Sequence, residues 1–188
     1  MRKLMLFDHV SLDGFVAGPE GEMDWIKVDN ELFDFGGKLI DEADTGLYGR
    51  VTYEMMQNYW PGAADLPNAS KHDIEHSQWY NRVDKVVISK SLKGSDLEKT
   101  QIISGNIQHE ITKIKEQPGR NIIMFGSPSA AYSLMEYNLI DEYWIFLNPI
   151  LIGKGILLFK NIQHQIHLKL AATKIFQSGV AALNYKKE

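Results

Sequence analysis

Two kinds of hydrophobic pattern, one typical of strands and one of helices, alternate along most of this chain of 188 residues. Short runs rich in β-branched and aromatic residues predict strands, and stretches with apolar residues at helical spacing predict the helices between them. This alternation is typical of a parallel sheet covered by helices. The strands are expected at 2–10, 44–49, 83–88, 101–104 and 121–125. The helices are expected at 30–41, 50–59, around 70–79, at 106–117 and from 128 onward.

The pattern changes after residue 140. Residues 141–149, 166–176 and 180–187 read as three strands with no strong helix between them, and 177–179 as a three-residue hairpin loop. Terminal strands of this kind are expected to add antiparallel pairs at one edge of the sheet. The sequence therefore predicts a three-layer α/β fold, with a mostly parallel central sheet and antiparallel C-terminal strands, as a single domain over 1–188.

Composition narrows the classes of function. A net charge of -4 gives no electrostatic footprint for nucleic acid or an anionic membrane. The chain has no cysteine, which excludes disulfides, thiol nucleophiles and thiolate metal sites and agrees with a cytoplasmic location. Residues 72–76 match the inverted zinc-protease pattern H-x-x-E-H. So short a pattern arises readily in a polar helix, and we expect no metal.

Two predicted strands end in a glycine that leads directly into a helix. Gly49 to Thr52 follows one strand, and Gly126 to Ser129 follows another, with Ser127 expected as the helix cap and Pro128 at the first helical position. The first amides of a helix lack intrahelical partners and carry the positive end of its dipole, so they bind phosphate. Because parallel strands end at the same edge of a sheet, two such helix ends suit a pyrophosphate.

A third strand end carries Ser89-Lys90-Ser91. Its hydroxyls and ammonium suit an adenosine ribose or its 2′-phosphate, although a plain polar loop has the same composition. Arg50 and Lys90 together would favour NADP over NAD through charge-assisted hydrogen bonds.

Six segments of the chain form a recognisable series: Ser11-Leu12-Asp13-Gly14, Gly49 to Glu54, Val86 to Leu92, Phe125-Gly126-Ser127, Leu139 to Glu142, and Pro149 to Gly155 running to Phe159. With these segments in this order, the chain resembles the dihydrofolate-reductase-like superfamily along essentially its whole length. Within that superfamily it is most similar to the reductase domain of the riboflavin-biosynthesis deaminase–reductase and its stand-alone bacterial relatives. The deaminase half itself is excluded, since its zinc signature needs cysteine.

The resemblance implies an eight-stranded mixed sheet that binds NADPH across its strand ends. Relatives often have two glycines where this chain has Gly126-Ser127. By motif, the cofactor-binding residues would be Gly49, Arg50, Val51 and Thr52 for the pyrophosphate and 2′-phosphate side, Ser89 and Lys90 for the adenosine ribose phosphate, Gly126, Ser127, Pro128 and Ser129 for the pyrophosphate, and Val16 with Ala17 near the nicotinamide.

The substrate half is less defined by the resemblance. Folate reductases bind the pterin through a carboxylate on the first helix. An ungapped count back from Gly49-Arg50 reaches Phe33, and the adjacent Asp34 is the candidate substrate-binding carboxylate, which would need an insertion or deletion to serve. A step of one residue turns a helical side chain by about 100°, which argues against folate reduction. Riboflavin-type reductases reduce an open-chain ribose, and a substrate of that kind would meet Pro149, Gly153 and Gly155.

The expected function is therefore an NADPH-dependent reductase of the 5-amino-6-(5-phosphoribosylamino)uracil reductase type, with Asp13 and His9 as candidate proton donors. Two alternatives remain open: a non-catalytic nucleotide-binding or interaction module on the same fold, and a true folate or pterin reductase. Exposed sheet edges invite pairing, so the apolar strands 166–176 and 180–187, taken as edge strands, predict a homodimer.

Overall fold

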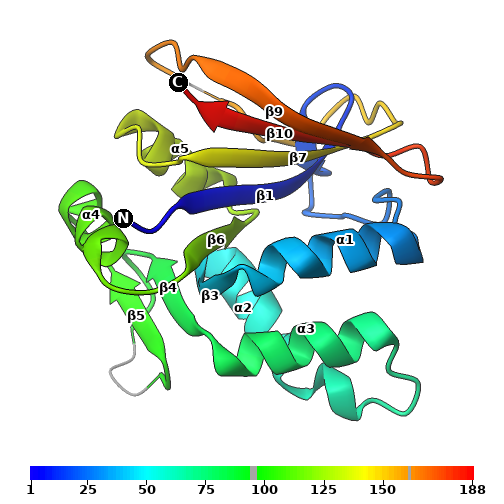
Figure 1. Cartoon of the computed structure of the whole chain (residues 1–188), viewed down its shortest axis with the longest axis horizontal. Helices are drawn as coiled ribbons and strands as arrows, with labels where there is room; N and C mark the ends of the chain where they lie inside the picture. The colour runs from blue at the N-terminus through cyan, green and yellow to red at the C-terminus, as the bar shows by residue number, and fades with distance from the viewer. Residues whose placement is uncertain (94–96, 161) are drawn as a thin grey trace.

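A computed structural model describes residues 1–93, 97–160 and 162–188. Within them, eight strands form one sheet in the order β5-β4-β3-β6-β1-β7-β10-β9 (Figure 1). The first six strands in this order run parallel to one another, and β10 runs antiparallel to both β7 and β9. This arrangement confirms the predicted fold class. The elements are β1 (Leu4–Ser11), β2 (Phe15–Ala17), α1 (Asn30–Asp41), β3 (Ala43–Gly49), α2 (Arg50–Tyr59), η1 (Trp60–Asp65), α3 (Lys71–Arg82), β4 (Asp84–Ile88), β5 (Thr100–Ile103), α4 (Ile107–Glu116), β6 (Asn121–Phe125), α5 (Pro128–Glu136), β7 (Glu142–Asn148), β8 (Ile156–Leu157), β9 (Leu168–Ile175) and β10 (Ala181–Lys187).

Helices cover both faces of the sheet, which explains why its central strands are apolar almost throughout. In β1, Leu4 and Leu6 lie in the core formed with α4 and α5, whereas Met5 lies in the core formed with α1, α2 and α3. Successive strand residues point to opposite faces. Each polar residue in such a strand is therefore placed against one helical layer or the other.

Three small elements escaped the sequence prediction. Strand β2 follows β1 and pairs with β8 in a separate two-stranded sheet, and η1 follows α2 directly. Strands of two or three residues are too short to show alternation, so periodicity cannot find them.

The two C-terminal strands differ in their exposure, which corrects one expectation. β10 is paired on both sides, and only β9 of the two lies at an edge of the sheet. On β9, Leu170 and Ile175 are exposed at 48% and 77%. The predicted homodimer would therefore have to use β9, and it stays a prediction.

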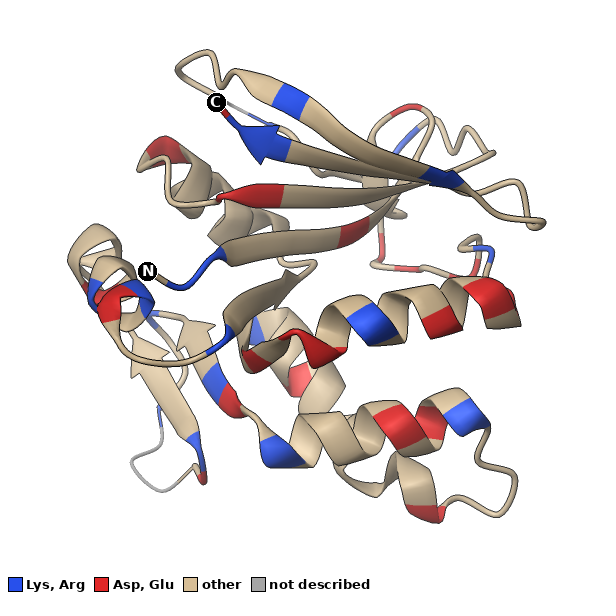
Figure 2. Cartoon of the chain, in the orientation of Figure 1, with Lys and Arg blue, Asp and Glu red and all other residues tan. Residues whose placement is uncertain are grey.

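Charged residues at the amino ends of the parallel strands are joined in ion pairs. Buried Arg2 pairs with Asp44, and buried Lys115 contacts the Asp141 carboxylate at 2.6 Å. Figure 2 shows the same edge as charged bands where β1 and β7 begin and β10 ends, near both termini. In the described parts of the chain, no helix is long and apolar enough to cross a membrane.

Candidate functional site

The carboxyl ends of five neighbouring strands form one continuous edge. In spatial order from β4 to β7 they carry Ser89, Gly49, Gly126, Ser11 and Asn148. Strands lie about 4.8 Å apart, so the edge runs for roughly 19 Å. That length suits an extended molecule better than a single phosphate group.

The two predicted helix ends are joined directly. The Gly49 N–H donates to Ser127 Oγ at 2.8 Å, across the pairing of β3 with β6. Ser127 occupies the cap position of α5, but it makes no side-chain cap hydrogen bond there. The expectation of a serine cap was therefore wrong in its contact: the hydroxyl holds the two turns together instead. As a result, the Gly49 amide is already engaged within the protein.

The turn into α5 is left-handed at two consecutive residues. Gly126 has φ +50° and Ser127 has φ +60°. Glycine adopts this region freely, whereas a residue with a Cβ pays roughly 1–2 kcal/mol. The geometry explains why two glycines suit this turn, and the hydrogen bond from Gly49 offsets the cost of serine at the second position.

The first turn of α2 faces solvent. Val51 is 69% exposed, and the Arg50 guanidinium lies at the surface, 2.7 Å from the Glu54 carboxylate. Thr52 lies behind them, its Oγ1 3.7 Å from the position a Cβ on Gly126 would take. Arg50, Val51 and Thr52 occupy the first three helical positions, whose amides have no intrahelical acceptor.

Ser89 and Lys90 differ in availability. The buried Ser89 Oγ accepts hydrogen bonds from the amides of Leu92, at 2.9 Å, and Ser91, at 3.2 Å, so this hydroxyl shapes its own loop. Lys90 is exposed. The cation, rather than the serine hydroxyl, is the group that a ligand could reach here.

Sequence reasoning missed Asp8, a buried carboxyl at the same edge. Burial raises its pKa to about 8, and Oδ2 has no hydrogen-bond partner among the described residues. Oδ1 lies 4.0 Å from the position of a Cβ on Gly126, beside the turn into α5. The signal was available: strand alternation places Asp8 on the same face as Leu6 and Val10, where a lone carboxylate is costly.

Asp13 connects the loop that follows β1 to the loop that follows β7 through hydrogen bonds. Its carboxylate accepts hydrogen bonds from Ser11 Oγ at 2.7 Å and from the amides of Gly153, at 2.7 Å, and Ile152, at 3.2 Å. The Ser11 hydroxyl contributes most to lowering the pKa of Asp13, and these backbone amides lower it further. A carboxylate held in its ionised form by three donors is a poor proton donor, so this geometry disfavours the catalytic role predicted for Asp13.

Val16 and Ala17 are buried in β2, where Ala17 pairs with Ile156 of β8. Gly155 adjoins them so closely that a Cβ there would collide with the Ala17 carbonyl. Pro149 is exposed and packs near the hairpin residue Gly179. The loop that follows β7 therefore lies against the loop that follows β1.

His9 lies on the opposite face of β1 from Asp8, toward α1. Its ring stacks on Phe146 with centroids 5.0 Å apart and meets Phe7 edge-on at 6.4 Å. Burial lowers the pKa of His9 to about 4, so the imidazole is neutral at physiological pH. Nδ1 lies 3.3 Å from Asn148 Nδ2.

Asp34 does not join this group. Its carboxylate is paired with Lys71 on α3 at 2.6 Å, and Phe33 stacks on His72 with centroids 4.1 Å apart. Both positions considered for a pterin-binding carboxylate thus face α3. His76, the last residue of the H-x-x-E-H pattern, packs against Trp60 with ring centroids 4.0 Å apart. The described residues contain no cluster of three or more His, Asp or Glu suited to a metal.

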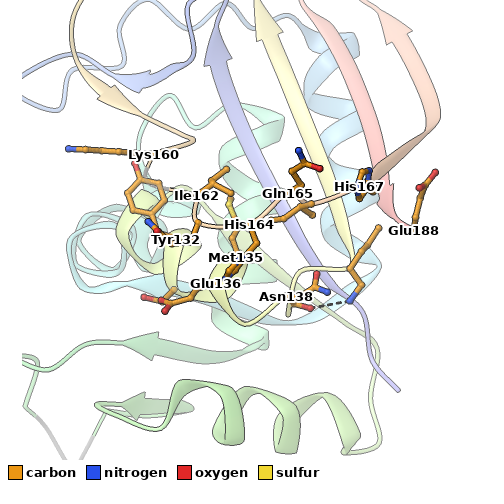
Figure 3. Close-up of a pocket in the computed structure, with 14 residues that line it drawn as sticks. Tyr132, Met135, Glu136, Asn138, Lys160, Ile162, His164, Gln165, His167 and Glu188 are labelled. Atoms are coloured by element: carbon orange, nitrogen blue, oxygen red, sulfur yellow. Dashed lines mark hydrogen bonds between the residues drawn. The ribbon is translucent and has the colours of Figure 1, made fainter.

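A cavity of about 660 Å³ lies elsewhere, between α5 and the chain that leads into β9 (Figure 3). It is lined by Tyr132, Asn138, His167 and Glu188 among others, which places it at the amino ends of the parallel strands. None of the predicted site residues lines it. The predicted site is an edge of strand ends and not this hollow.

The family model of the RibD C-terminal domain matches residues 2–182. The chain belongs to this family. It is similar to the uncharacterized protein YyaP of Bacillus subtilis (strain 168), with 32% identity over 188 residues, covering 98% of this chain and 94% of that protein.

Two solved structures share the fold of this family member. A putative riboflavin biosynthesis protein from Shewanella sp. PV-4 superposes with a TM-score of 0.77 at 19% identity, covering 99% of both chains. A dihydrofolate reductase from Enterococcus faecalis, complexed with NADP(H), has a TM-score of 0.65 at 16% identity, covering 99% of this chain and 96% of that one. The resemblance to riboflavin-type and folate-type reductases is thereby confirmed at the level of family and fold.

Proposed function

We propose that this chain is an NADPH-dependent reductase that delivers a hydride to a carbonyl or imine carbon of a small substrate, of the 5-amino-6-(5-phosphoribosylamino)uracil reductase type. The observation that carries the proposal is the continuous edge in which the first turns of α2 and α5 are joined through Gly49 and Ser127. Membership of the RibD C-terminal domain family supports the same reaction class.

The residues at this edge fit an anionic dinucleotide. Asp8 Oδ2 has no partner in the part of the chain that the structure describes, and burial raises the pKa of Asp8 to about 8, so at neutral pH the carboxyl is mostly a protonated donor that does not repel phosphate. Arg50, which follows Gly49, and Lys90, which follows the neighbouring strand β4, offer exposed cations that would favour a 2′-phosphate. When bound, the nicotinamide would supply the hydride, and the protein would supply orientation and electrostatics.

Of the two candidate groups on the substrate side, His9 and Asp13, His9 is the better candidate to contact the substrate. It is neutral, lies at the carboxyl end of β1 and faces the layer of α1, whereas Asp13 is occupied in bracing loops. The loop of Pro149, Gly153 and Gly155 is held near β2 by Asp13 and by the contact of Gly155 with Ala17. These residues are proposed to enclose the substrate.

The rival reading as a folate reductase is disfavoured by the placement of Asp34 and Phe33 against α3. A panel of pyrimidine, pterin and aldehyde substrates, followed by loss of NADPH absorbance, tests the choice. Turnover of the ribosylamino-pyrimidine with none of dihydrofolate is the expected result. NADPH binding without turnover of any compound would replace the reductase by a nucleotide-binding module.

Two further proposals concern assembly and location. A homodimer would pair or pack β9, whose exposed Leu170 and Ile175 flank an unpaired strand edge. A monomer mass in light scattering would rule it out. A cytoplasmic location fits a chain without cysteine and is tested by cell fractionation.

A further inference from the structure

Asn148, the last residue of β7, is completely buried and bonded at both ends of its side-chain amide. Oδ1 accepts a hydrogen bond from the Lys27 amide at 2.9 Å, and Nδ2 donates one to the Phe146 carbonyl at 2.9 Å. A backbone N–H can only donate and a carbonyl can only accept. The orientation of the Asn148 amide is therefore fixed by two backbone groups of known polarity.

This orientation determines what His9 can do. Nδ2 carries two hydrogens, and while one is used by Phe146 the other faces His9 Nδ1 at 3.3 Å. Because Nδ2 is a donor, Nδ1 must accept, which requires the neutral ring to carry its hydrogen on Nε2. Among the described residues, no group is hydrogen-bonded to Nε2.

The surroundings of the ring agree with the neutral state. Phe7 and Phe146 pack on it, and both are apolar. Burial is the cause that lowers the pKa of His9. A neutral imidazole that presents N–H is a hydrogen-bond donor to a developing negative charge, a role distinct from that of an imidazolium acid.

We propose that Asn148 is a positioning residue that locks His9 as the Nε2–H tautomer, so that His9 donates a hydrogen bond to the heteroatom of the substrate. The heteroatom then takes its proton from solvent water rather than from His9. The assignment of substrate to this face rests on the proposed function. The tautomer itself depends only on Asn148, Lys27 and Phe146.

Nitrogen-15 NMR of the full-length protein, correlating ring nitrogens with ring carbon-bound protons, tests the proposal at pH 7 without any ligand. The His9→Gln variant identifies the His9 signals by their loss. The expected wild-type pattern is an unprotonated Nδ1 and a protonated Nε2. A protonated Nδ1, or a charged ring at pH 7, would overturn the proposal even if NADPH binds well.

The Asn148→Asp variant asks whether Asn148 is the cause. A carboxylate accepts where the amide donated, so His9 is expected to move its hydrogen to Nδ1 and to show a pKa raised by about one to three units. Asn184→Asp is the matched control, since Asn184 is also buried and lies on the adjacent strand β10. If both variants leave the His9 signals unchanged, Asn148 does not set the tautomer.

Turnover separates this role from the proposed function. With an active substrate, wild-type kcat is expected to show no histidine step between pH 5 and 8, and Asn148→Asp to lower kcat more than NADPH affinity. A kcat that rises as pH falls through this window both in wild type and in Asp8→Asn, which removes the titration of Asp8 near pH 8, would show proton transfer from His9 and contradict its role as a neutral donor. Failure of NADPH to bind would remove the function but leave the NMR result intact.

Discussion

The two edges of the parallel sheet both hold buried polar residues, but they satisfy them differently. At the amino edge, Lys115 is bonded to Asp141 and to the Leu139 carbonyl, at 2.6 and 2.9 Å. At the carboxyl edge, within the described residues, one oxygen of Asp8 has no hydrogen-bond partner and one ring nitrogen of His9 is engaged. Buried polar groups are normally satisfied inside a folded protein. The paired edge therefore stabilises the fold, and the groups without partners at the other edge are consistent with the cofactor site proposed there.

The largest effect is expected at the paired edge. Lys115→Met removes the cation from Asp141 and should lower the free energy of unfolding by about 3 kcal/mol, since breaking a buried pair leaves its partner uncompensated. Urea denaturation measures the change. Lys71→Met, which breaks an exposed pair with Asp34, is the control and should change nothing detectable. Equal losses in the two variants would contradict the account of this edge.

Asp8, at the carboxyl edge, is expected to change how the free energy of unfolding depends on pH. The folded-state pKa of Asp8 is raised to about 8, so the folded protein binds a proton that the unfolded chain has released above pH 4. Stability contributed by this proton is therefore lost as pH rises toward 8, by about 1 kcal/mol per unit between pH 6.5 and 7.5. Half-buried His9 and buried His76, with folded-state pKa values lowered to about 4 and 3, are neutral in the folded protein throughout this window. In the unfolded chain they still bind protons near pH 6.5, which adds an opposite slope that is the same in wild type and in a variant of Asp8.

Denaturation at several pH values compares wild type with Asp8→Asn. The variant cannot titrate at this position. Between pH 6.5 and 7.5 it should therefore lack the loss of about 1 kcal/mol per pH unit in the free energy of unfolding that wild type owes to Asp8. Parallel curves for the two proteins would mean that Asp8 is ionised in the folded state.

Substitution of Arg50 tests whether the carboxyl edge contacts a phosphate of the cofactor. Arg50→Ala should weaken NADPH binding by about tenfold, or 1.4 kcal/mol, by removing a charge-assisted contact to phosphate. Glu54→Ala is the matched control, because it breaks the same exposed ion pair but keeps the cation. An affinity that falls equally in both variants would indicate a change in the helix rather than in a phosphate contact.

The smallest effect is expected at the joint of the two helix ends. Ser127→Ala loses the hydrogen bond from Gly49 and keeps a left-handed residue with a Cβ, whereas Ser127→Gly loses the bond but relieves the strain. The glycine variant should therefore be the more stable of the two by about 1 kcal/mol. Thermal unfolding in one buffer decides the order, and a more stable alanine variant would refute the strain argument.

Much of the fold could be predicted from sequence because its signals are local. The helix at 30–41 and the turn from Gly49 into the helix at 50–59 agree with the structure to the residue. Each is encoded by neighbouring residues, through helical spacing and through glycine before a helix. The position of β10 inside the sheet is a matter of long-range pairing, and the apolar pattern of the strand does not contain it.

The candidate site was predicted as strand ends but not as contacts. Asp13 meets the Gly153 amide, 140 residues away in sequence, and His9 meets Asn148, 139 residues away. No local sequence pattern shows which of the two candidate proton donors, Asp13 or His9, is already hydrogen-bonded within the protein through such a distant contact. The burial of Asp8 is the exception, since an acidic residue on the inward face of a buried strand is visible in the sequence itself.

The most direct test of the central claim is calorimetric titration of NADPH and NADH into the wild-type protein. Micromolar binding of NADPH, with NADH weaker by about tenfold or more, is the predicted result for a strand-end edge that holds a dinucleotide and its 2′-phosphate. If neither nucleotide binds, the carboxyl edge does not serve a nicotinamide cofactor, and the proposed reductase is contradicted.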